Sequence, residues 1–314
     1  MLRRTALTLA LAAPALARAQ GASLRILLPQ APGASNDMVA RIIQEPMAAA
    51  LRQPVVIENR PGANGAVAIN ALKQARNDGQ TLLLTGVSQL AFNPHLYRAL
   101  PYDVARDFTM IAPVTDTPFV LISSRRSGIT TLAQFREAAR TRDLSYASAG
   151  IGNSTHLAME MLAERAGVRL THVPYPGTAQ GVTSVVTGET DAMIPTLGVA
   201  FAQIQAGAVQ ALAVLAAGRV PQLPDVPTQA QAGLDAPIMP GWFALVGLAG
   251  LPSGTVATLN AAVRASLADA TVQRRLQEQF LIPLLGSATE MQARLDGESA
   301  LWGDFIRARQ LTVN

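Results

Sequence analysis

Short apolar runs alternate with amphipathic stretches along the chain from Leu24 onward. The apolar run Leu24–Leu28 predicts a buried strand, and the apolar positions three and four apart in Asp37–Leu51 predict a helix. Pro46 should kink or shorten this helix, because proline removes a backbone hydrogen bond. The same patterns predict further strands at Val55–Ile57, Thr81–Thr85, Phe119–Ser123, Leu144–Ser148, Thr171–Tyr175, Ala192–Pro195 and Ala211–Ala216, and further helices at Ala66–Ala75, Thr131–Arg140, Thr155–Ala166 and Ala179–Thr187. Strands and helices that alternate at this spacing indicate the α/β class.

Two such series, separated near residue 120, predict two lobes that each contain a sheet covered by helices. The mostly helical region Ser253–Arg309 is expected to return to the first lobe. We therefore assign residues 20–120 and 241–314 to the first lobe and residues 121–240 to the second. Ligands of open α/β sheets bind beyond the carboxyl ends of the strands, so the candidate site is the cleft between the lobes.

Residues 1–19 have the pattern of a secretory signal peptide. Arg3 and Arg4 provide the positive start, the apolar segment Ala6–Ala13 follows, and Ala17-Arg18-Ala19 fits a cleavage site. The apolar segment is too short for a membrane-spanning helix, which needs about 20 residues. Cleavage would remove three arginines and lower the formal charge from +4 to +1. We expect a periplasmic protein, exported by the general or the twin-arginine route, rather than a cytosolic protein with a helical tail.

The composition removes several classes of function. The 314 residues include no cysteine, which excludes disulfide scaffolds, thiolate metal sites and cysteine nucleophiles. The histidines His95, His156 and His172 lie far apart and form no metal-binding motif. Lys and Arg outnumber Asp and Glu by only 25 to 21, and no basic run interleaves with aromatic residues. We therefore expect no metal, no cofactor and no nucleic-acid partner.

The loop Pro29–Asp37, called loop one below, joins a predicted strand to a predicted helix. Gly33 permits unusual backbone angles, and Ser35 or Asn36 can cap the helix. Backbone N–H groups at such a helix start can hold an anionic oxygen, although an ordinary capped turn has the same spacing. Asp37 would repel a carboxylate unless it caps the helix or holds a bridging water.

The loop Ser148–His156, called loop two below, repeats this arrangement in the second series. It follows a predicted strand, contains two glycines and enters a helix at Asn153–Thr155. Small hydroxyl and amide side chains beside free N–H groups suit carboxylate recognition without a buried cation. Because the two loops would face each other across the cleft, we favour a binding role over a plain helix cap. Neither loop matches a nucleotide-binding motif.

Other polar residues receive structural interpretations. A third loop, Glu58–Gly65, contains Arg60, which we expect to pair with a neighbouring carboxylate. His156 could act as a general base, but no Ser–His–Asp order or pair of catalytic carboxylates accompanies it, so a structural role is preferred. Trp242 and Trp302 are expected to pack in the core or at a hinge.

These loops, in this order, resemble those of the Bug-type (TctC-like) extracytoplasmic solute receptors of tripartite tricarboxylate transporters. The resemblance spans nearly the whole chain after the signal peptide. Its matching segments are Ala31–Asp37, Glu58–Ala63, Asp78–Leu83, Asn93–Tyr97, Leu100–Phe108, Tyr146–Leu157, His172–Gly177 and Leu223–Gly233. This sequence departs from the family where Ala34 replaces a second glycine, which would narrow that end of the pocket.

The resemblance implies a two-lobed type II periplasmic-binding-protein fold, with each lobe a mixed, mostly parallel sheet flanked by helices. It also implies a monomer that closes on a small organic carboxylate and delivers it to the membrane permease subunits of a tripartite tricarboxylate transporter. Carried over by position, the ligand contacts are Gly33, Ala34, Ser35 and Asp37 (the last through water) in the first lobe and Gly152, Asn153, Ser154 and Thr155 in the second, with Thr85 and Ser88 as weaker candidates.

Three alternatives stay open. The closed receptor could dock a sensor kinase instead of a permease, which only neighbouring genes for membrane subunits would decide. A secreted hydrolase with a cleft serine and His156 would turn over an ester or an amide. An amino-acid receptor would usually place an arginine against the ligand carboxylate, and the two loops contain none.

Overall fold

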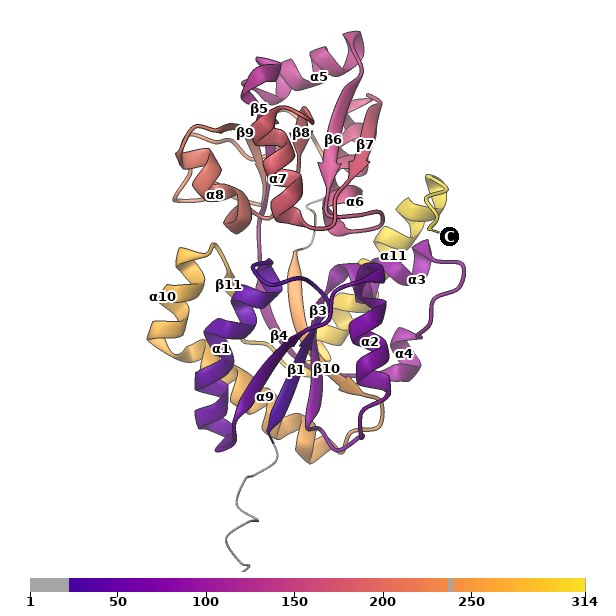
Figure 1. Cartoon of the computed structure of the whole chain (residues 1–314), viewed down its shortest axis with the longest axis vertical. Coiled ribbons are helices and arrows are strands. Elements are labelled where there is room, and N and C mark those ends of the chain that lie inside the picture. Colours follow the sequence, from indigo (N-terminus) through magenta and orange to yellow (C-terminus); the bar gives the residue numbers. More distant parts are fainter. Residues whose placement is uncertain (1–22, 237–238, 240, 314) are drawn as a thin grey trace, which may run out of the picture.

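The computed structural model describes residues 23–236, 239 and 241–313 of the chain, and in Figure 1 these form two lobes with one sheet each. The predicted signal peptide at residues 1–19 lies outside the described residues. Among the helices of the described part, none combines the length and the hydropathy required to span a membrane.

The sheet of the first lobe has six strands in the order β11-β4-β10-β3-β1-β2. Their bounds are β1 (Leu24–Leu28), β2 (Val55–Asn59), β3 (Thr81–Gly86), β4 (Phe108–Asp116), β10 (Trp242–Leu248) and β11 (Ile282–Pro283). β1 pairs in parallel with β2 and β3, whereas β10 runs antiparallel to β3 and β4, and β11 antiparallel to β4. β10 follows the whole second lobe in the sequence, yet it lies between β3 and β4 in this sheet.

The sheet of the second lobe has five strands in the order β7-β6-β8-β5-β9. They are β5 (Phe119–Ser124), β6 (Leu144–Ser148), β7 (Leu170–Pro174), β8 (Ala192–Met193) and β9 (Val209–Leu215). β6 pairs in parallel with β7 and β8, and β5 lies antiparallel between β8 and β9. The two-lobed mixed α/β fold is therefore confirmed. Antiparallel pairs take a larger share than we predicted, because β5 and β10 enter their sheets directly from the other lobe, without a crossover helix.

Helices cover both faces of each sheet (Figure 1). The helices are α1 (Ser35–Leu51), α2 (Ala66–Lys73), α3 (Asn93–Leu96), α4 (Val104–Asp107), α5 (Leu132–Thr141), α6 (Ser154–Ala166), α7 (Thr178–Thr187), α8 (Leu197–Gln205), α9 (Ser253–Ala268), α10 (Ala270–Glu278) and α11 (Ala288–Ala308), with short 3₁₀ turns η1 (Ala63–Gly65) and η3 (Arg125–Ser127) and a π-helical turn η2 (Ser88–Phe92). Contrary to expectation, α1 runs unbroken through Pro46. The mostly helical C-terminal region is confirmed by α9, α10 and α11.

Alternation along the strands places side chains on opposite faces of the first sheet. Ile26 and Leu28 of β1 pack in a cluster with α1 and α9, whereas Leu27 packs on the other face with α2. The cluster that includes Leu27 continues into the second lobe, and it contains both Phe135 of α5 and Trp302 of α11. The lobes therefore share their largest apolar core.

Two chain segments cross between the lobes and touch each other. The first runs from β4 to β5 through Thr117, and the second ends at Gly241, just before β10. The Thr117 N–H donates to the Gly241 carbonyl oxygen at 2.7 Å. A Cβ atom at position 241 would lie 2.2 Å from the Thr117 carbonyl oxygen, so this close approach requires glycine.

Candidate functional site

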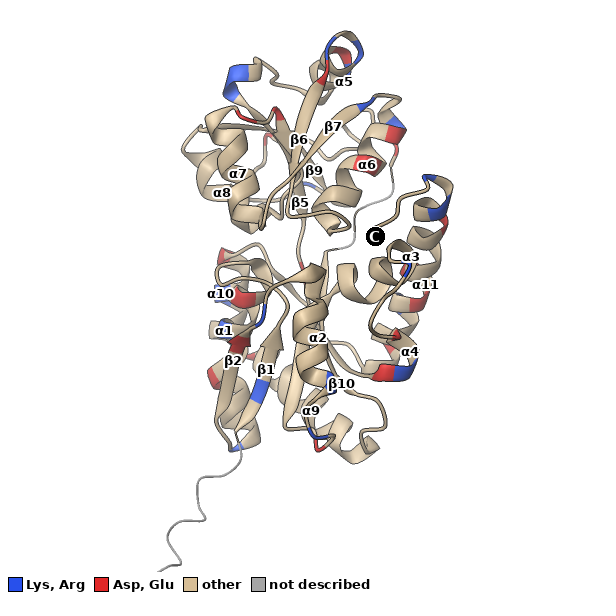
Figure 2. Ribbon diagram, turned by 45° about the vertical axis from the view of Figure 1, so that its right-hand side comes forward, with Lys and Arg blue, Asp and Glu red and all other residues tan. Residues whose placement is uncertain are grey.

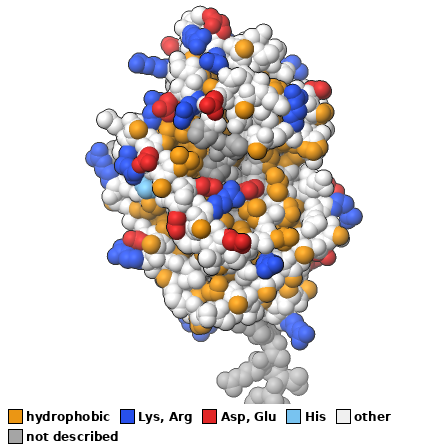
Figure 3. Space-filling model, turned by 180° about the vertical axis from the view of Figure 1, so that it is seen from behind, with side chains coloured by type: hydrophobic (Ala, Val, Ile, Leu, Met, Phe, Trp, Pro, Cys, Tyr) orange, Lys and Arg blue, Asp and Glu red, His pale blue; other side chains and the backbone are white. Residues whose placement is uncertain are grey.

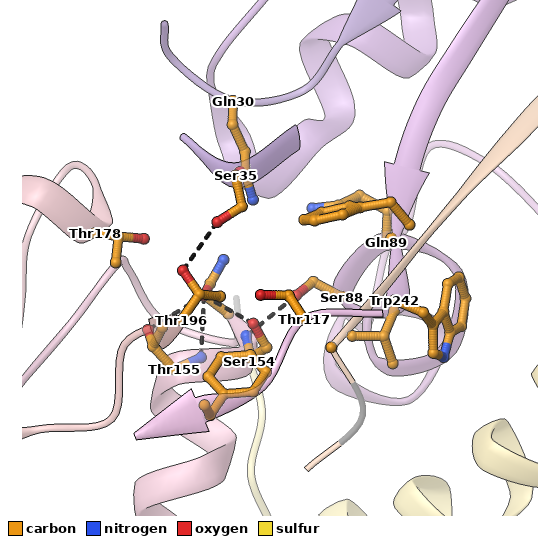
Figure 4. A pocket seen from close by; sticks show the side chains of 16 residues that line it. Gln30, Ser35, Ser88, Gln89, Thr117, Ser154, Thr155, Thr178, Thr196 and Trp242 are labelled. Carbon is orange, nitrogen blue, oxygen red and sulfur yellow. Dashed lines mark hydrogen bonds between the residues drawn. The ribbon is translucent and has the colours of Figure 1, made fainter. Parts of the chain in front are cut away.

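Polar side chains from both lobes surround a small hollow in the cleft, called the inner hollow below. Figure 4 shows how these side chains converge. Hydroxyl groups come from Ser35, Ser88, Thr117, Ser154, Thr155, Thr178 and Thr196, and carboxamides from Gln30, Gln89 and Asn153. Phe119, Trp242 and Phe243 form the apolar part of the wall.

A wider outer hollow adjoins the inner one, and both are lined by Gln30, Gln89, Asn153 and Thr178. Loop one contributes Pro29–Ala34 to its wall, and loop two contributes Ala149, Gly150 and Asn153. The prediction that the two loops face each other across a cleft is thus confirmed. The outer wall is completed by Pro61–Gly65 and Tyr175–Gln180, with Val199.

Charged side chains are absent from the described residues that line either hollow. In Figure 2 the Lys, Arg, Asp and Glu residues lie mostly on the outer parts of the lobes. Seen from behind, charges of both signs are interspersed rather than gathered by sign (Figure 3). The inner hollow is therefore a neutral chamber rich in O–H and N–H donors, which can stabilise an anionic oxygen by hydrogen bonds without an ion pair.

Loop one enters α1 without a side-chain cap. We expected Ser35 or Asn36 to cap the helix, but Ala34 occupies the cap position and α1 begins at Ser35. The Ser35 hydroxyl instead lies 2.9 Å from the hydroxyl of Thr196, across the cleft. Within the described part of the chain, the N–H groups of Ser35, Asn36 and Asp37 have no hydrogen-bond acceptor. Of these three residues, Ser35 lines the inner hollow, where the start of a helix can hold an anionic oxygen.

Asp37 lines neither hollow, in contrast to the expectation that it faces the ligand through water. Its carboxylate accepts the Gly33 N–H at 2.9 Å and pairs with Arg41 at 3.0 Å. Burial raises the pKa of Asp37, but the hydrogen bonds from Arg41 and from the Gly33 N–H outweigh that effect, so the pKa lies below its ordinary value. Asp37 therefore holds the turn at Gly33, whose φ is +82°.

Loop two enters α6 with a cap. The helix begins where the sequence predicted, and the Asn153 side chain accepts the Thr155 N–H at 3.1 Å. We also expected free N–H groups at this helix start, and the structure shows them bound. The Ser154 N–H donates to the Ser88 hydroxyl across the cleft at 3.1 Å, and the Gly152 N–H donates to Nδ1 of His156. The groups that loop two directs into the hollow are therefore side chains, namely hydroxyls and a carboxamide.

The ten predicted contacts divide into three groups. Those that line the inner hollow are Ser35, Ser88, Asn153, Ser154 and Thr155, and those that line the outer hollow are Gly33 and Ala34, together with Asn153. Asp37, Thr85 and Gly152 line neither of them. The fully buried Thr85 hydroxyl donates to Oε1 of Gln89 at 3.1 Å and so orients that carboxamide.

Sequence reasoning missed five polar residues of the inner hollow, which are Gln30, Gln89, Thr117, Thr178 and Thr196. Thr196 follows the predicted strand Ala192–Pro195, so the rule that ligands bind beyond strand ends could have found it. Thr117 belongs to a crossing between the lobes, and its hydroxyl is buried without a partner in the described residues. Nothing in its sequence context marks that position.

Two structural interpretations from the sequence are confirmed. Arg60 pairs with Glu58, and Trp242 and Trp302 are buried in the core. His156 is buried as well and accepts a backbone N–H. A serine and a histidine do meet, because the Ser148 hydroxyl lies 2.6 Å from Nε2 of His172, but Ser148 is fully buried and lines neither hollow.

Comparison with known proteins identifies the family. Residues 39–311 match the model of the tripartite tricarboxylate transporter family receptor, TctC. The chain belongs to this receptor family. A curated relative, the UPF0065 protein in the tcbD-tcbE intergenic region of Pseudomonas sp. strain P51, is 36% identical over 292 residues, which are 92% of this chain and 86% of the relative.

Solved structures resemble the whole receptor. One is an R. palustris protein with adipate, at 30% identity and a TM-score of 0.86, which covers 91% of this chain and 96% of the neighbour. Another is MatC from Rhodopseudomonas palustris with bound malate, at 30% identity and a TM-score of 0.84, with 90% and 98% covered. The fold and the family are those of solute-binding proteins.

Proposed function

We propose that the receptor captures a small organic carboxylate in the inner hollow and delivers it to the membrane permease subunits of a tripartite tricarboxylate transporter. The observation that carries this proposal is the neutral chamber of hydroxyl and amide donors between the lobes. Membership of the receptor family supports the transport role, and the adipate and malate bound by the two similar proteins support a carboxylate.

Closure of the lobes would follow from contacts on both sides of the ligand. The first lobe offers the N–H groups at the start of α1 and the hydroxyls of Ser35 and Ser88, and the second offers Ser154 and Thr155. A carboxylate bound by donors from both lobes stabilises the closed state over the open one. Gly33 and Ala34 would contact the part of the ligand that extends into the outer hollow.

The cellular setting is part of the same proposal. We propose export through the signal peptide at residues 1–19, function as a periplasmic monomer, and lobe boundaries near residues 120 and 241. These boundaries are consistent with the changes of sheet between β4 and β5 and between β9 and β10.

A thermal-shift series tests the binding claim. We would measure the purified mature receptor with straight-chain monocarboxylates and dicarboxylates, malate and benzoate, each paired with its carboxamide. At least one acid should stabilise the fold increasingly as its concentration rises, and its amide should not, because stabilisation grows as RT ln(1 + [L]/Kd). Equal shifts by an acid and its amide, or no shift by any acid, would contradict the proposal.

Two further measurements separate the alternative functions. Methyl esters of the binding acids should stay intact during incubation with the receptor, whereas hydrolysis would favour an enzyme. Deletion of the receptor gene should abolish uptake of the radiolabelled acid in cells, and deletion of the permease genes should have the same effect. Uptake that survives both deletions, with a lost transcriptional response to the acid, would favour a sensor.

A further inference from the structure

Two buried histidines stack on each other behind loop two. His156 lies in the first turn of α6 and His172 lies in β7, with ring centroids 4.1 Å apart and planes 15° from parallel. Tyr146 of β6 stacks with both rings, with its centroid 4.9 Å from that of His172 and 6.3 Å from that of His156. These elements neighbour one another in the second lobe (Figure 1). His156 is 7% exposed.

Each histidine makes its hydrogen bond to loop two. Nδ1 of His156 accepts the Gly152 N–H at 3.1 Å. Nε2 of His172 lies 2.6 Å from the Ser148 hydroxyl, which accepts the Gly150 N–H and donates to the Gly150 carbonyl oxygen, both at 3.2 Å. The two glycines have φ values of +111° and +77°. The histidines therefore hold the backbone on both sides of the loop tip, at two glycines whose positive φ values other residues rarely adopt.

The contact at Gly152 requires a neutral ring. Nδ1 of His156 can accept an N–H only when it carries no proton, and a proton there would turn two donors toward each other. Burial lowers the pKa of His156 to about 4. Burial and then the neighbouring His156 lower the pKa of His172 to about 4, although Glu160 acts in the opposite direction. Both rings are thus neutral at the pH at which the receptor would work.

The surroundings of the stack contain few other charges. Among the described residues, Tyr146 stacks with His172, and its hydroxyl donates to Glu160 at 2.6 Å. Glu160 in turn lies 3.5 Å from Arg309, which follows α11 in the first lobe. Neither charged group makes a hydrogen bond to a histidine ring, so the two rings are bound to loop two rather than to an ion pair.

An apolar pair of similar size would fill the space behind loop two without the cost of burying ring nitrogens. We propose that His156 and His172 are positioning residues, whose neutral rings hold loop two in the shape that places Asn153, Ser154 and Thr155 at the inner hollow. This inference rests on the proposed function of that hollow. It assigns the two histidines to recognition without a contact to the ligand.

Matched substitutions at His156 test the loop contact in the ligand-free receptor. His156→Phe keeps a ring in the stack and removes the acceptor, whereas His156→Asn places an oxygen near the position of Nδ1. Hydrogen exchange at the Gly152 amide should become at least about tenfold faster in the phenylalanine variant and change less than about threefold in the asparagine variant. Equal exchange rates in the two variants would overturn the proposal, and so would a protonated Nδ1 of His156 in ¹⁵N spectra of the native receptor at pH 7.

Calorimetry then connects the loop to binding, with adipate as the probe and malate if adipate does not bind. Affinity should fall about tenfold or more in His156→Phe and stay within about threefold in His156→Asn. In the native receptor it should change less than about twofold between pH 8 and 5.5, because a ring with a pKa of about 4 stays neutral there. Unchanged affinity in the phenylalanine variant, or a loss centred near pH 6.5, would overturn the inference. If no acid binds, the proposed function fails, and the amide exchange still decides whether the histidines hold the loop.

Discussion

Loop one and loop two occupy corresponding places in the two lobes, yet they present opposite chemistry to the cleft. Loop one enters α1 at Ala34 with no side-chain cap, so the N–H groups of Ser35, Asn36 and Asp37 keep no acceptor in the described structure. Loop two enters α6 through the cap of Asn153, and the N–H groups of Gly152, Ser154 and Thr155 are bound within the protein. We infer that one lobe offers backbone donors and the other offers side-chain donors. Similar strand–loop–helix patterns can thus supply complementary halves of a site.

The largest expected effect is the loss of the side-chain donors of loop two. Ser154→Ala combined with Thr155→Ala should lower carboxylate affinity about 100-fold, because hydrogen bonds to a charged group contribute about 1.5–3 kcal/mol each. Isothermal calorimetry measures this change. The control is Thr183→Ala with Thr187→Ala in α7, whose hydroxyls bond only to carbonyl oxygens of their own helix. Equal losses of carboxylate affinity in both double variants would show that loop two is not part of the binding site.

A cap added to loop one should make the two loops alike. In Ala34→Asn, the new side chain would accept an N–H at the start of α1, so the helix gains about 0.5–1 kcal/mol while the ligand loses a donor. We expect affinity to fall about tenfold as the melting temperature rises. The reciprocal variant, Asn153→Ala, should lower stability by about 1 kcal/mol. A stabilised Ala34→Asn receptor with native affinity would show that loop one offers no backbone donors to the ligand.

The turn at Gly33 gives a smaller effect with a matched control. Gly33 and Gly128 have φ values of +82° and +72°, and a Cβ atom at either position would meet no atom within 4 Å. Alanine at each should therefore cost about 1–2 kcal/mol of stability through backbone strain alone. Only Gly33→Ala should also weaken ligand binding, by about fivefold. Denaturant unfolding and calorimetry measure the two quantities, and equal affinities would place the Gly33 turn outside recognition.

The smallest effect concerns Asp37, which the structure places behind loop one. Its folded pKa lies below the unfolded value, so ionised Asp37 stabilises the fold above pH 3.8, and this contribution is lost as the pH falls through the folded pKa. Asp37→Asn should cost less than about 1 kcal/mol at pH 7, because Arg41 is half exposed and solvent screens the pair. The difference from the native receptor should shrink as the pH falls below 3.8 in urea unfolding. A large loss of affinity in Asp37→Asn would instead indicate that Asp37 contacts the ligand through water.

The sequence predicts the fold better than the site. An apolar run such as Leu24–Leu28 predicts a buried strand directly. Successive side chains point to opposite faces of the sheet, so a strand that is covered on both faces is apolar at nearly every position. The direction of a strand is harder to predict from the sequence. β10 is antiparallel to its neighbours because the chain enters it from the other lobe. The helix start at Asn153–Thr155 was predicted. The lack of a side-chain cap at Ala34 was not predicted, because no residue type marks a helix start without a cap.

Within the site, residues adjacent to a glycine-rich loop were predictable and those brought in by tertiary structure were not. Ser35 and Ser154 belong to loop sequences that indicate a helix start. Thr117 and Thr196 reach the inner hollow only because the second lobe folds back over the first. The hydroxyl of Thr196 then becomes the partner of Ser35, which no local pattern indicates.

The apolar cluster that includes Leu27, Phe135 and Trp302 has a consequence for how the molecule comes apart. Since one continuous body of buried side chains belongs to both halves, neither half retains its interior when the other melts. Heating should therefore give a single cooperative transition in calorimetry rather than two resolved peaks. Either half expressed by itself should expose that interior to water and aggregate.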